Sequence, residues 1–263
     1  MDLGLKGKTA LVAAASRGLG KATAMGLAKE GANVVIAARD EGTLRATAEE
    51  IRRATGSRVL AVPADLNQVE DIEALVRATE SEFGQIDILI NNAGGPPSGG
   101  FTDVGDEAWL HAVNLNLMSA IRLTRLVLSG MRERGWGRIV NIVSSSVKEP
   151  MPTLILSGAV RSSIVSMAKT LSRQVAAEGI TVNNVAPGYI LTDRVRDLAR
   201  SRAENEGKNV EEVIEEMTVS TPMARMGQPE ELAALITFLA SECASYITGT
   251  TIQADGGQLH GLL

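Results

Sequence analysis

The amino-acid sequence predicts an α/β protein built on a single doubly wound parallel sheet. Short, near-continuous apolar runs alternate with longer segments of helical periodicity along the chain. Runs of this kind are typical of a parallel sheet that is covered on both faces. Gly31-Ala32 and Gly179-Ile180 end helices just before the next strand, where glycine supplies the left-handed turn of a short loop. We therefore expect right-handed crossovers and helices on both faces of the sheet.

The order of these segments predicts seven strands, each short, rich in Val, Ile and Ala, and bounded by turn signals. The predicted strands are Lys8–Ala13, Asn33–Ala38, Arg58–Val62, Ile86–Asn91, Arg138–Val143, Thr181–Ala186 and Thr250–Ala254. Polar stripes on a helical period predict helices at Gly18–Glu30, Gly42–Ala54, Val69–Phe83 and Asp106–Arg134. The chain has no linker, repeat or low-complexity segment, so we expect one domain over residues 1–263.

Residues 193–225 depart from this alternation, because they are highly charged and are interrupted by Gly207. They follow the sixth predicted strand, at the sheet edge where doubly wound folds bind ligands. We expect one or two surface helices that form a lid, rather than only a solvated face. Arg194 and Arg196 at its start are expected to be solvated, and contact with an anionic carrier is the alternative.

The composition indicates an ordinary folded protein with an aliphatic core. The chain has 263 residues, of which 44% are hydrophobic and 3% aromatic, and its net charge is −5. This acidic balance argues against nucleic acid and anionic membranes as partners, and no apolar run approaches a membrane span. The single Cys243 cannot form an internal disulfide and is expected to be packed. The N-terminal apolar run stops at Ser16-Arg17 without a signal-peptide layout, so we expect a cytoplasmic protein.

A turn poor in large side chains follows the first predicted strand and opens the first predicted helix. Small residues there let a pyrophosphate approach the backbone N–H groups at the helix N-terminus. Ala14 keeps the turn slim but lacks the easy access of glycine to positive φ. We therefore expect the turn to form and to bind a dinucleotide more weakly than its glycine counterpart. The predicted contacts are Ala14, Ser16, Arg17, Gly18, Leu19 and Gly20.

The end of the second predicted strand, Ala38-Arg39, predicts which dinucleotide binds. An acid at this strand end takes the ribose hydroxyls of NAD, and here Ala38 stands in its place. Arg39 and Arg17 can clamp a 2′-phosphate through forked, charge-assisted hydrogen bonds. We expect NADP(H), with NAD as the less favoured cofactor, although Asp40 places an opposing charge nearby.

The sequence that begins GRIVNIVSSS and ends NNVAPGYILT resembles the active-site half of the short-chain dehydrogenase/reductase family. The tail ASYITGTTIQADGGQ resembles the last strand and glycine-rich turn of the same family, so the resemblance covers nearly the whole chain. It implies a Rossmann fold and cofactor contacts at several strand ends. The contacts that it implies are Asp65 and Leu66 at the adenine, Asn92, Ala93 and Gly94 along the cofactor, and Pro187, Gly188, Ile190 and Thr192 at the nicotinamide.

The family pattern for catalysis is a serine, a tyrosine thirteen residues later and a lysine four residues further. Ser144 is present, but Ser157 and Arg161 occupy the tyrosine and lysine positions. In the family the serine fixes the carbonyl oxygen, the tyrosine transfers the proton, and the lysine lowers the tyrosine pKa and holds the ribose. An asparagine of the fourth helix anchors a relay water, and the resemblance assigns that role to Asn114.

The replacement of tyrosine and lysine changes the expected acid–base chemistry. A serine hydroxyl is much less acidic than the tyrosine hydroxyl, so Ser157 is a poor general acid without help. Arg161 keeps the charge and stays protonated, so it cannot move a proton. We expect cofactor binding to survive better than turnover, with Ser144, Ser157 and Arg161 polarising the substrate oxygen. The proton then comes from water, Ser157, Lys148 or Tyr189, although Tyr189 is more simply a pocket wall.

We expect an NADP-dependent oxidoreductase, similar to the 3-oxoacyl-[acyl-carrier-protein] reductase branch, that acts on a small carbonyl or alcohol substrate. The alternative is a dinucleotide-binding sensor or partner subunit that has lost catalysis. Nothing specific in the sequence favours a lyase or an isomerase. His111 is expected to be a surface residue, and no Cys/His cluster predicts a metal. The resemblance implies a homodimer or homotetramer packed through the small apolar face of Thr153–Glu178.

Overall fold

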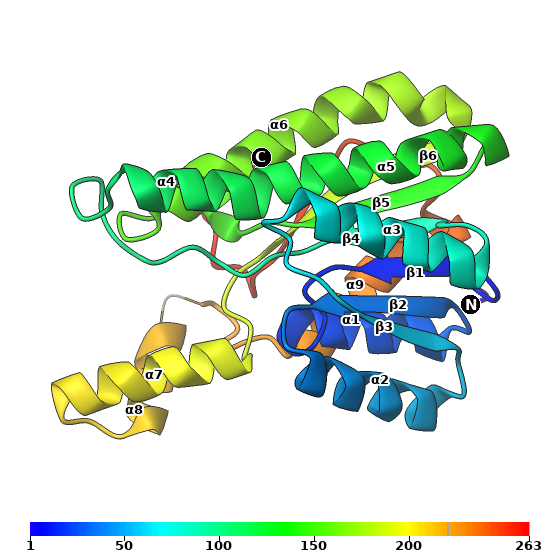
Figure 1. Cartoon of the computed structure of the whole chain (residues 1–263). Helices are drawn as coiled ribbons and strands as arrows, with labels where there is room; N and C mark the ends of the chain where they lie inside the picture. The colour runs from blue at the N-terminus through cyan, green and yellow to red at the C-terminus, as the bar shows by residue number, and fades with distance from the viewer. Residues whose placement is uncertain (220, 263) are drawn as a thin grey trace.

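A computed structural model describes residues 1–219 and 221–262, without the side chains of residues 198, 201 and 205. Its centre is one seven-stranded parallel sheet in the order β3-β2-β1-β4-β5-β6-β7 (Figure 1). The predicted α/β class and the doubly wound parallel sheet are confirmed. The strands are β1 Thr9–Val12, β2 Asn33–Ala38, β3 Val59–Pro63, β4 Ile88–Asn91, β5 Gly137–Ile142, β6 Ile180–Pro187 and β7 Thr251–Ala254.

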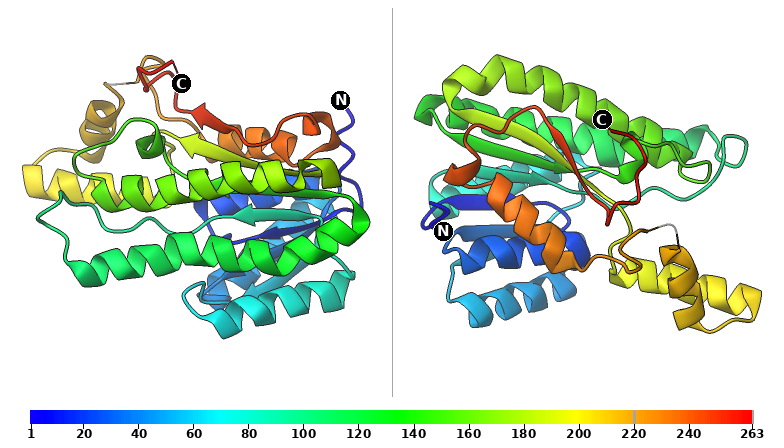
Figure 2. Two further views of the ribbon diagram at one scale, coloured as in Figure 1. Left: turned by 90° about the horizontal axis from the view of Figure 1, so that it is seen from above. Right: turned by 180° about the vertical axis from the view of Figure 1, so that it is seen from behind.

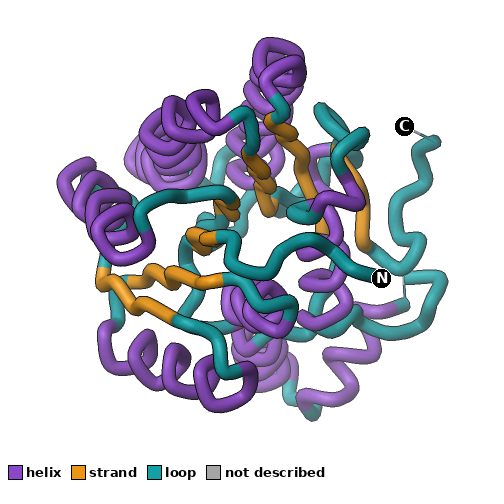
Figure 3. The backbone as a smooth tube through the Cα atoms, turned by 90° about the vertical axis from the view of Figure 1, so that its right-hand side faces the viewer, coloured by secondary structure: helices purple, strands orange, loops and turns teal. Residues whose placement is uncertain are grey.

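Helices cover both faces of this sheet, as the views from above and from behind show (Figure 2). Seen from its edge, the twisted sheet lies between the two helical layers (Figure 3). One layer consists of α1 Gly18–Lys29, α2 Glu41–Thr55 and α9 Pro229–Leu239, and the other of α3 Val69–Phe83, α5 Ser119–Arg134 and α6 Ile155–Val175. The strand side chains alternate between the layers, because Val12 packs in the first core cluster and Leu11 in the second.

The predicted helix Asp106–Arg134 is divided in the structure. Helix α4 spans Asp106–Ala112, a π-helical segment spans Val113–Met118, and α5 continues from Ser119. A π-helical insertion shifts the side chains that follow it relative to those before it, and such insertions are frequent at functional sites. Cys243, which we expected to be packed, lies exposed in a 3₁₀ turn, because the preceding helix α9 already ends at Leu239.

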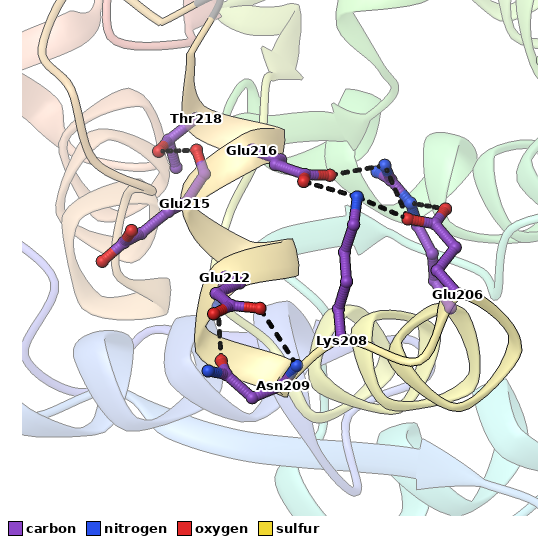
Figure 4. Close-up of polar contacts among 8 residues, drawn as sticks. Glu206, Lys208, Asn209, Glu212, Glu215, Glu216 and Thr218 are labelled. Carbon is purple, nitrogen blue, oxygen red and sulfur yellow. Dashed lines mark hydrogen bonds and ion pairs between the residues drawn. The ribbon is translucent and has the colours of Figure 1, made fainter.

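The charged segment after β6 forms two helices, α7 Asp193–Glu206 and α8 Val210–Thr218. They are set apart from the sheet (Figure 1) and pack on each other through Ala199, Ala203 and Val213. Lys208, between the two helices, forms one ion pair with Glu206 of α7 and another with Glu216 of α8 (Figure 4).

The two ends of the α7–α8 segment are tied together where the segment leaves and rejoins the body. Leu191 N donates to Gly227 O over 2.8 Å, and Gly227 N donates to Tyr189 O over 3.0 Å. These bonds flank a short parallel bridge between Ile190 and Gly227. The segment therefore starts and finishes at one point beside the carboxyl end of β6. In the described part of the chain, no helix combines the length and apolar character needed to cross a membrane.

Candidate active site

The carboxyl ends of the parallel strands meet at one edge of the sheet, and most of the predicted site residues follow them. Strands β1 and β4 are neighbours at the centre, where the connections turn to opposite sides. Ligands of doubly wound sheets bind in the crevice at this switch point. The candidate site is therefore built around the segments that follow β1, β4, β5 and β6.

The turn after β1 adopts the conformation that we expected to be difficult for alanine. Ala14 has a φ of 48° and Gly18 a φ of 57°. The side-chain amide of Asn92 donates to the carbonyl oxygens of Ala13 and Ala14, each over 3.2 Å, and so fixes the turn from β4. A Cβ on Gly20 would lie 2.4 Å from Ala14 O, so only glycine lets α1 start this close to the strand.

The two arginines predicted to bind a 2′-phosphate lie on the surface beside this turn. Arg17 and Arg39 are both exposed, and neither forms an ion pair with the described residues. Asp40 does not pair with Arg39 but caps α2, accepting from Thr43 N over 2.8 Å. Those bonds from Thr43, and then the charge of Arg17, lower the pKa of Asp40. Both guanidinium groups are thus available to a ligand.

The remaining predicted cofactor contacts lie at strand ends or in the turn. Asp65 accepts from both the backbone N–H and the side chain of Asn67, which orders the loop after β3, and Leu66 is buried beside it. Gly188 lies so near β7 that a Cβ would stand 2.8 Å from Asp255 Cβ, and Thr192 caps α7. Ser16 O accepts from Thr47. Leu19 and Ala93 are half-buried, Ile190 is buried, and Pro187 ends β6.

Three serine hydroxyls lie in a row after β5. Ser144 Oγ accepts from both the backbone N–H and the hydroxyl of Ser146, over 3.2 and 2.9 Å. Ser146 Oγ in turn lies 3.5 Å from Ser157 Oγ on α6. Ser146 is buried and was not predicted from the sequence, although its position between two candidate serines was a usable signal. Because Ser144 accepts both bonds, its own hydrogen is available to donate.

Arg161 lies one helical turn after Ser157 and is buried, with 7% of its surface exposed. Its guanidinium donates to Ile142 O over 2.9 Å and to Ala93 O over 3.4 Å. Burial first, and then the charge of Arg194, lower the pKa of Arg161 to about 10. Arg161 is therefore protonated at neutral pH, holds the ends of β4 and β5 together, and does not act as a proton carrier.

The structure does not bring Asn114 to the serine row. Its amide donates to Asn67 O over 3.0 Å, and its side-chain oxygen accepts from Arg122, so it holds the β3–α3 loop. Asn116 instead lines a small cavity together with Arg161 and donates to Gly94 O over 2.8 Å. Both asparagines belong to the π-helical segment, whose altered winding the sequence did not reveal. Asn114 is thus held at the β3–α3 loop, whereas Asn116 is the asparagine of this segment that shares a cavity with Arg161.

The other proton-donor candidates differ in their surroundings. Tyr189 follows β6, and its backbone oxygen accepts from Gly227 N over 3.0 Å. Lys148 is half-buried directly after the 3₁₀ turn of Ser145–Val147. His111 is exposed on α4, as expected for a surface residue. Among the residues that the structure describes, no group of acidic, His and Cys side chains is arranged to hold a metal.

Arg194 is the residue of the charged segment that reaches the site. Its guanidinium donates to Gly95 O over 2.9 Å and to Pro96 O over 3.3 Å. We expected solvation, with contact to an anionic carrier as the alternative, and the first turn of α7 places this side chain over the loop after β4. Ala93, Gly94, Gly95 and Pro96 thus present four successive carbonyls to the side chains of Arg161, Asn116 and Arg194.

Comparisons with known proteins agree with this arrangement. A family model described as enoyl-(acyl carrier protein) reductase matches residues 13–258. The D-beta-hydroxybutyrate dehydrogenase of Cupriavidus necator is 35% identical over 254 residues, which cover 96% of this chain and 98% of that protein. The chain belongs to the short-chain dehydrogenase/reductase family. It is accordingly an oxidoreductase, as predicted.

Two further proteins are similar to the chain over nearly its whole length. The 3-oxoacyl-[acyl-carrier-protein] reductase of Synechocystis sp. is 35% identical over 256 residues, which cover 97% of this chain and 98% of that protein. The crystal structure of L-sorbose reductase from Gluconobacter frateurii, complexed with NADPH and L-sorbose, superposes with a TM-score of 0.97. It is 35% identical, and the match covers 100% of each chain.

Proposed function

We propose that this chain catalyses NADPH-dependent interconversion of a carbonyl and an alcohol on a small molecule of the 3-oxoacyl type. The observation that carries the proposal is the serine row of Ser144, Ser146 and Ser157, placed beside a buried guanidinium at the end of β5. Hydroxyl donors next to a fixed cation stabilise the charge that develops on a carbonyl oxygen. The relatives named as reductases of acyl-carrier thioesters support this substrate class.

The residues of the β1 turn fit a dinucleotide. Gly20 allows close approach of α1 to the turn, while a Cβ on Gly94 would meet no atom within 4 Å, which leaves open space above the β4 loop. Arg17 and Arg39 are placed for the 2′-phosphate, consistent with the NADPH named in the L-sorbose reductase complex. When bound, NADPH supplies the hydride that adds to the carbonyl carbon.

The chain's own residues bind the carbonyl oxygen and supply its proton. Ser144 donates to that oxygen, Ser146 donates to Ser144, and Ser157 contacts Ser146 from α6. Arg161 adds a fixed positive charge. Reduction also needs one proton on the oxygen, and a serine does not ionise readily. We assign its delivery to the hydroxyl row, which passes a proton from water to the oxygen. Lys148, half-buried beside the row, is the alternative donor.

The test is NADPH consumption with a panel of 3-oxoacyl thioesters and small ketones. We expect turnover with at least one member and a lower rate for Ser144→Ala. Tight NADPH binding without turnover on any member would overturn the reductase and favour a dinucleotide sensor. In that case the double variant Ser157→Tyr with Arg161→Lys reports whether the scaffold is a former enzyme, because it restores the family's catalytic pair.

We further propose that the protein works in the cytoplasm as a homo-oligomer joined through α5 and α6. An apolar groove between these helices is lined by Ile121, Leu128, Met167 and Leu171, among others. Side chains of this kind are rarely left open to water in a contiguous groove. Light scattering after gel filtration is expected to give a dimer or tetramer. An Ile121→Glu variant with a folded spectrum is expected to be smaller, and a monomeric parent would contradict the proposal.

A further inference from the structure

Two guanidinium groups bracket the loop after β4, and both are satisfied only by neutral carbonyls. Arg161 donates to Ile142 O and Ala93 O, and Arg194 donates to Gly95 O and Pro96 O. Neither forms an ion pair with any carboxylate that the structure describes. Two positive charges therefore lie beside residues 93–96, and neither is paired with a carboxylate of the described residues.

Arg138, which is also buried, shows how a guanidinium is paired with an acid elsewhere in this fold. Arg138 is 2% exposed, stacks on the Trp136 ring and lies 3.4 Å from a carboxylate oxygen of Glu242. Burying an uncompensated charge costs free energy, so buried cations are usually paired with an acid. Arg161 has no such acid among the described residues, and the charge of Arg194 acts on it repulsively. An anion entering between them removes that repulsion.

The position of Arg194 makes it the reachable member of the pair. It is exposed and belongs to the first turn of α7, two residues after the cap Thr192. Its guanidinium lies directly over Gly95, where an added Cβ would be 3.2 Å from Nη1. An arginine carries five N–H donors, and the two carbonyls leave several of them for a ligand.

We propose that Arg194, backed by the charge of Arg161, binds a carboxylate group on the substrate. This inference rests on the proposed function, the reduction of an oxo group, and names free oxo or hydroxy acids rather than thioesters as its substrates. A planar guanidinium matches a carboxylate through two parallel hydrogen bonds. The phosphates of a dinucleotide have their own places at the start of α1 and at Arg17 and Arg39, which leaves the pair of Arg161 and Arg194 for the substrate.

The first experiment compares substrates that differ only in charge. Acetoacetate, 2-oxobutyrate and levulinate are each assayed against their own methyl ester and against a short acetoacetyl thioester. We expect kcat/KM for at least one acid to exceed that of its ester by about 10-fold or more, as for a charged hydrogen-bonded pair. Esters or thioesters that match or exceed the acids in every pair overturn the carboxylate site.

The second experiment assigns the preference to Arg194. Arg194→Met removes the guanidinium but keeps an unbranched side chain, and Arg196→Met is the control on the same helix. The acid-to-ester ratio is expected to fall toward one in Arg194→Met and to stay unchanged in Arg196→Met. A ratio that is unchanged in Arg194→Met, with NADPH binding weakened about 10-fold, assigns Arg194 to a cofactor phosphate and overturns the proposal.

A binding measurement separates this inference from the proposed function. Calorimetry with NADP⁺ present, titrating 3-hydroxybutyrate against its methyl ester, needs no turnover. Selective binding of the acid without reduction of any oxo acid overturns the reductase but keeps the carboxylate site. Reduction of neutral ketones without selective binding of any acid overturns the carboxylate site but keeps the reductase. The same titration with Arg194→Met is expected to lose the selectivity.

Discussion

The side-chain amide of Asn92 lies 3.2 Å from the carbonyl oxygen of Ala14 and holds that residue in a left-handed conformation. An L-residue with a side chain is strained there, whereas glycine is not. The β1 turn is therefore maintained by a partner from β4 against the preference of its own residue. This relationship explains how the turn keeps the shape of a dinucleotide site without the glycine that the family usually carries.

The variant Ala14→Gly is expected to increase the free energy of unfolding by about 1 kcal/mol, because it removes the left-handed strain of a β-carbon. Equilibrium denaturation measures this directly. Ala13→Gly is the matched control: Ala13 is fully buried and has no positive φ, so its loss of packing is expected to destabilise the protein. A destabilised Ala14→Gly would show that the strain is absent in solution.

The choice of dinucleotide is expected to depend on Arg39. Arg39→Ala should weaken NADPH binding by roughly 10-fold to 100-fold, the usual range for lost hydrogen bonds to a charged group. NADH has no 2′-phosphate, so its binding should be unaffected, and fluorescence titration with both cofactors gives the ratio. Arg45→Ala serves as the control, because Arg45 pairs with Glu41 on the neighbouring helix. Equal weakening of NADPH and NADH binding would show that Arg39 does not contact the 2′-phosphate.

The serine row makes a prediction about Ser146, which contacts both flanking serines. Ser146→Ala interrupts the row and is expected to lower kcat by at least about 10-fold, the lower part of the range for proton transfer, with little change in cofactor binding. The solvent deuterium isotope effect on kcat should rise as proton delivery becomes limiting. Ser145→Ala, next to it and without a side-chain hydrogen bond in the described structure, should leave kcat unchanged. Equal effects of both variants would argue for a packing role.

The α7–α8 segment is expected to loosen in acid. Hydrogen bonds from Arg202, and then Lys208, lower the pKa of Glu206 to about 2. A carboxyl whose pKa is lower in the folded protein stabilises it above its ordinary value of 4.5, and that contribution disappears as pH falls from 4.5 to about 2. Amide hydrogen exchange of α8 relative to α1 should therefore increase across this window. Glu206→Gln should remove the pH dependence, whereas an unchanged profile in that variant would point to another carboxyl.

The sequence predicted the sheet well because each strand has its own local signal. Apolar period, helix ends and turn residues are properties of neighbouring positions, and the strand bounds differ from prediction by at most two residues at either end. Asn116 was missed because its position has no local signal in the sequence. Whether Asn114 or Asn116 faces Arg161 depends on the π-helical winding between them, which has no simple residue signature.

The contacts of Arg194 with the β4 loop were also not predicted from the sequence, which indicated solvation or contact with an anionic carrier. Its side chain crosses from α7 to Gly95 and Pro96, residues nearly a hundred positions earlier in the chain. Only the placement of the start of α7 beside the loop after β4 creates that contact. Ser146 was partly predictable, because Ser144 and Ser157 were identified from the sequence. That Ser146 lies between their hydroxyls follows from the 3₁₀ turn, which the sequence did not predict.

The bridge between Ile190 and Gly227 closes the α7–α8 segment at its base, so that the segment can differ in sequence while the sheet is kept. Since the intervening residues leave and return at the same point, changes in their number or sequence need not disturb the sheet. Arg194, in the first turn of α7, brings a charge to the loop after β4 from outside the strands of the sheet. If Arg194 binds the substrate as proposed, substrate choice and hydride chemistry are carried by separable parts of the chain. Grafting the segment between Ile190 and Gly227 onto a related reductase would move substrate choice without rebuilding its core.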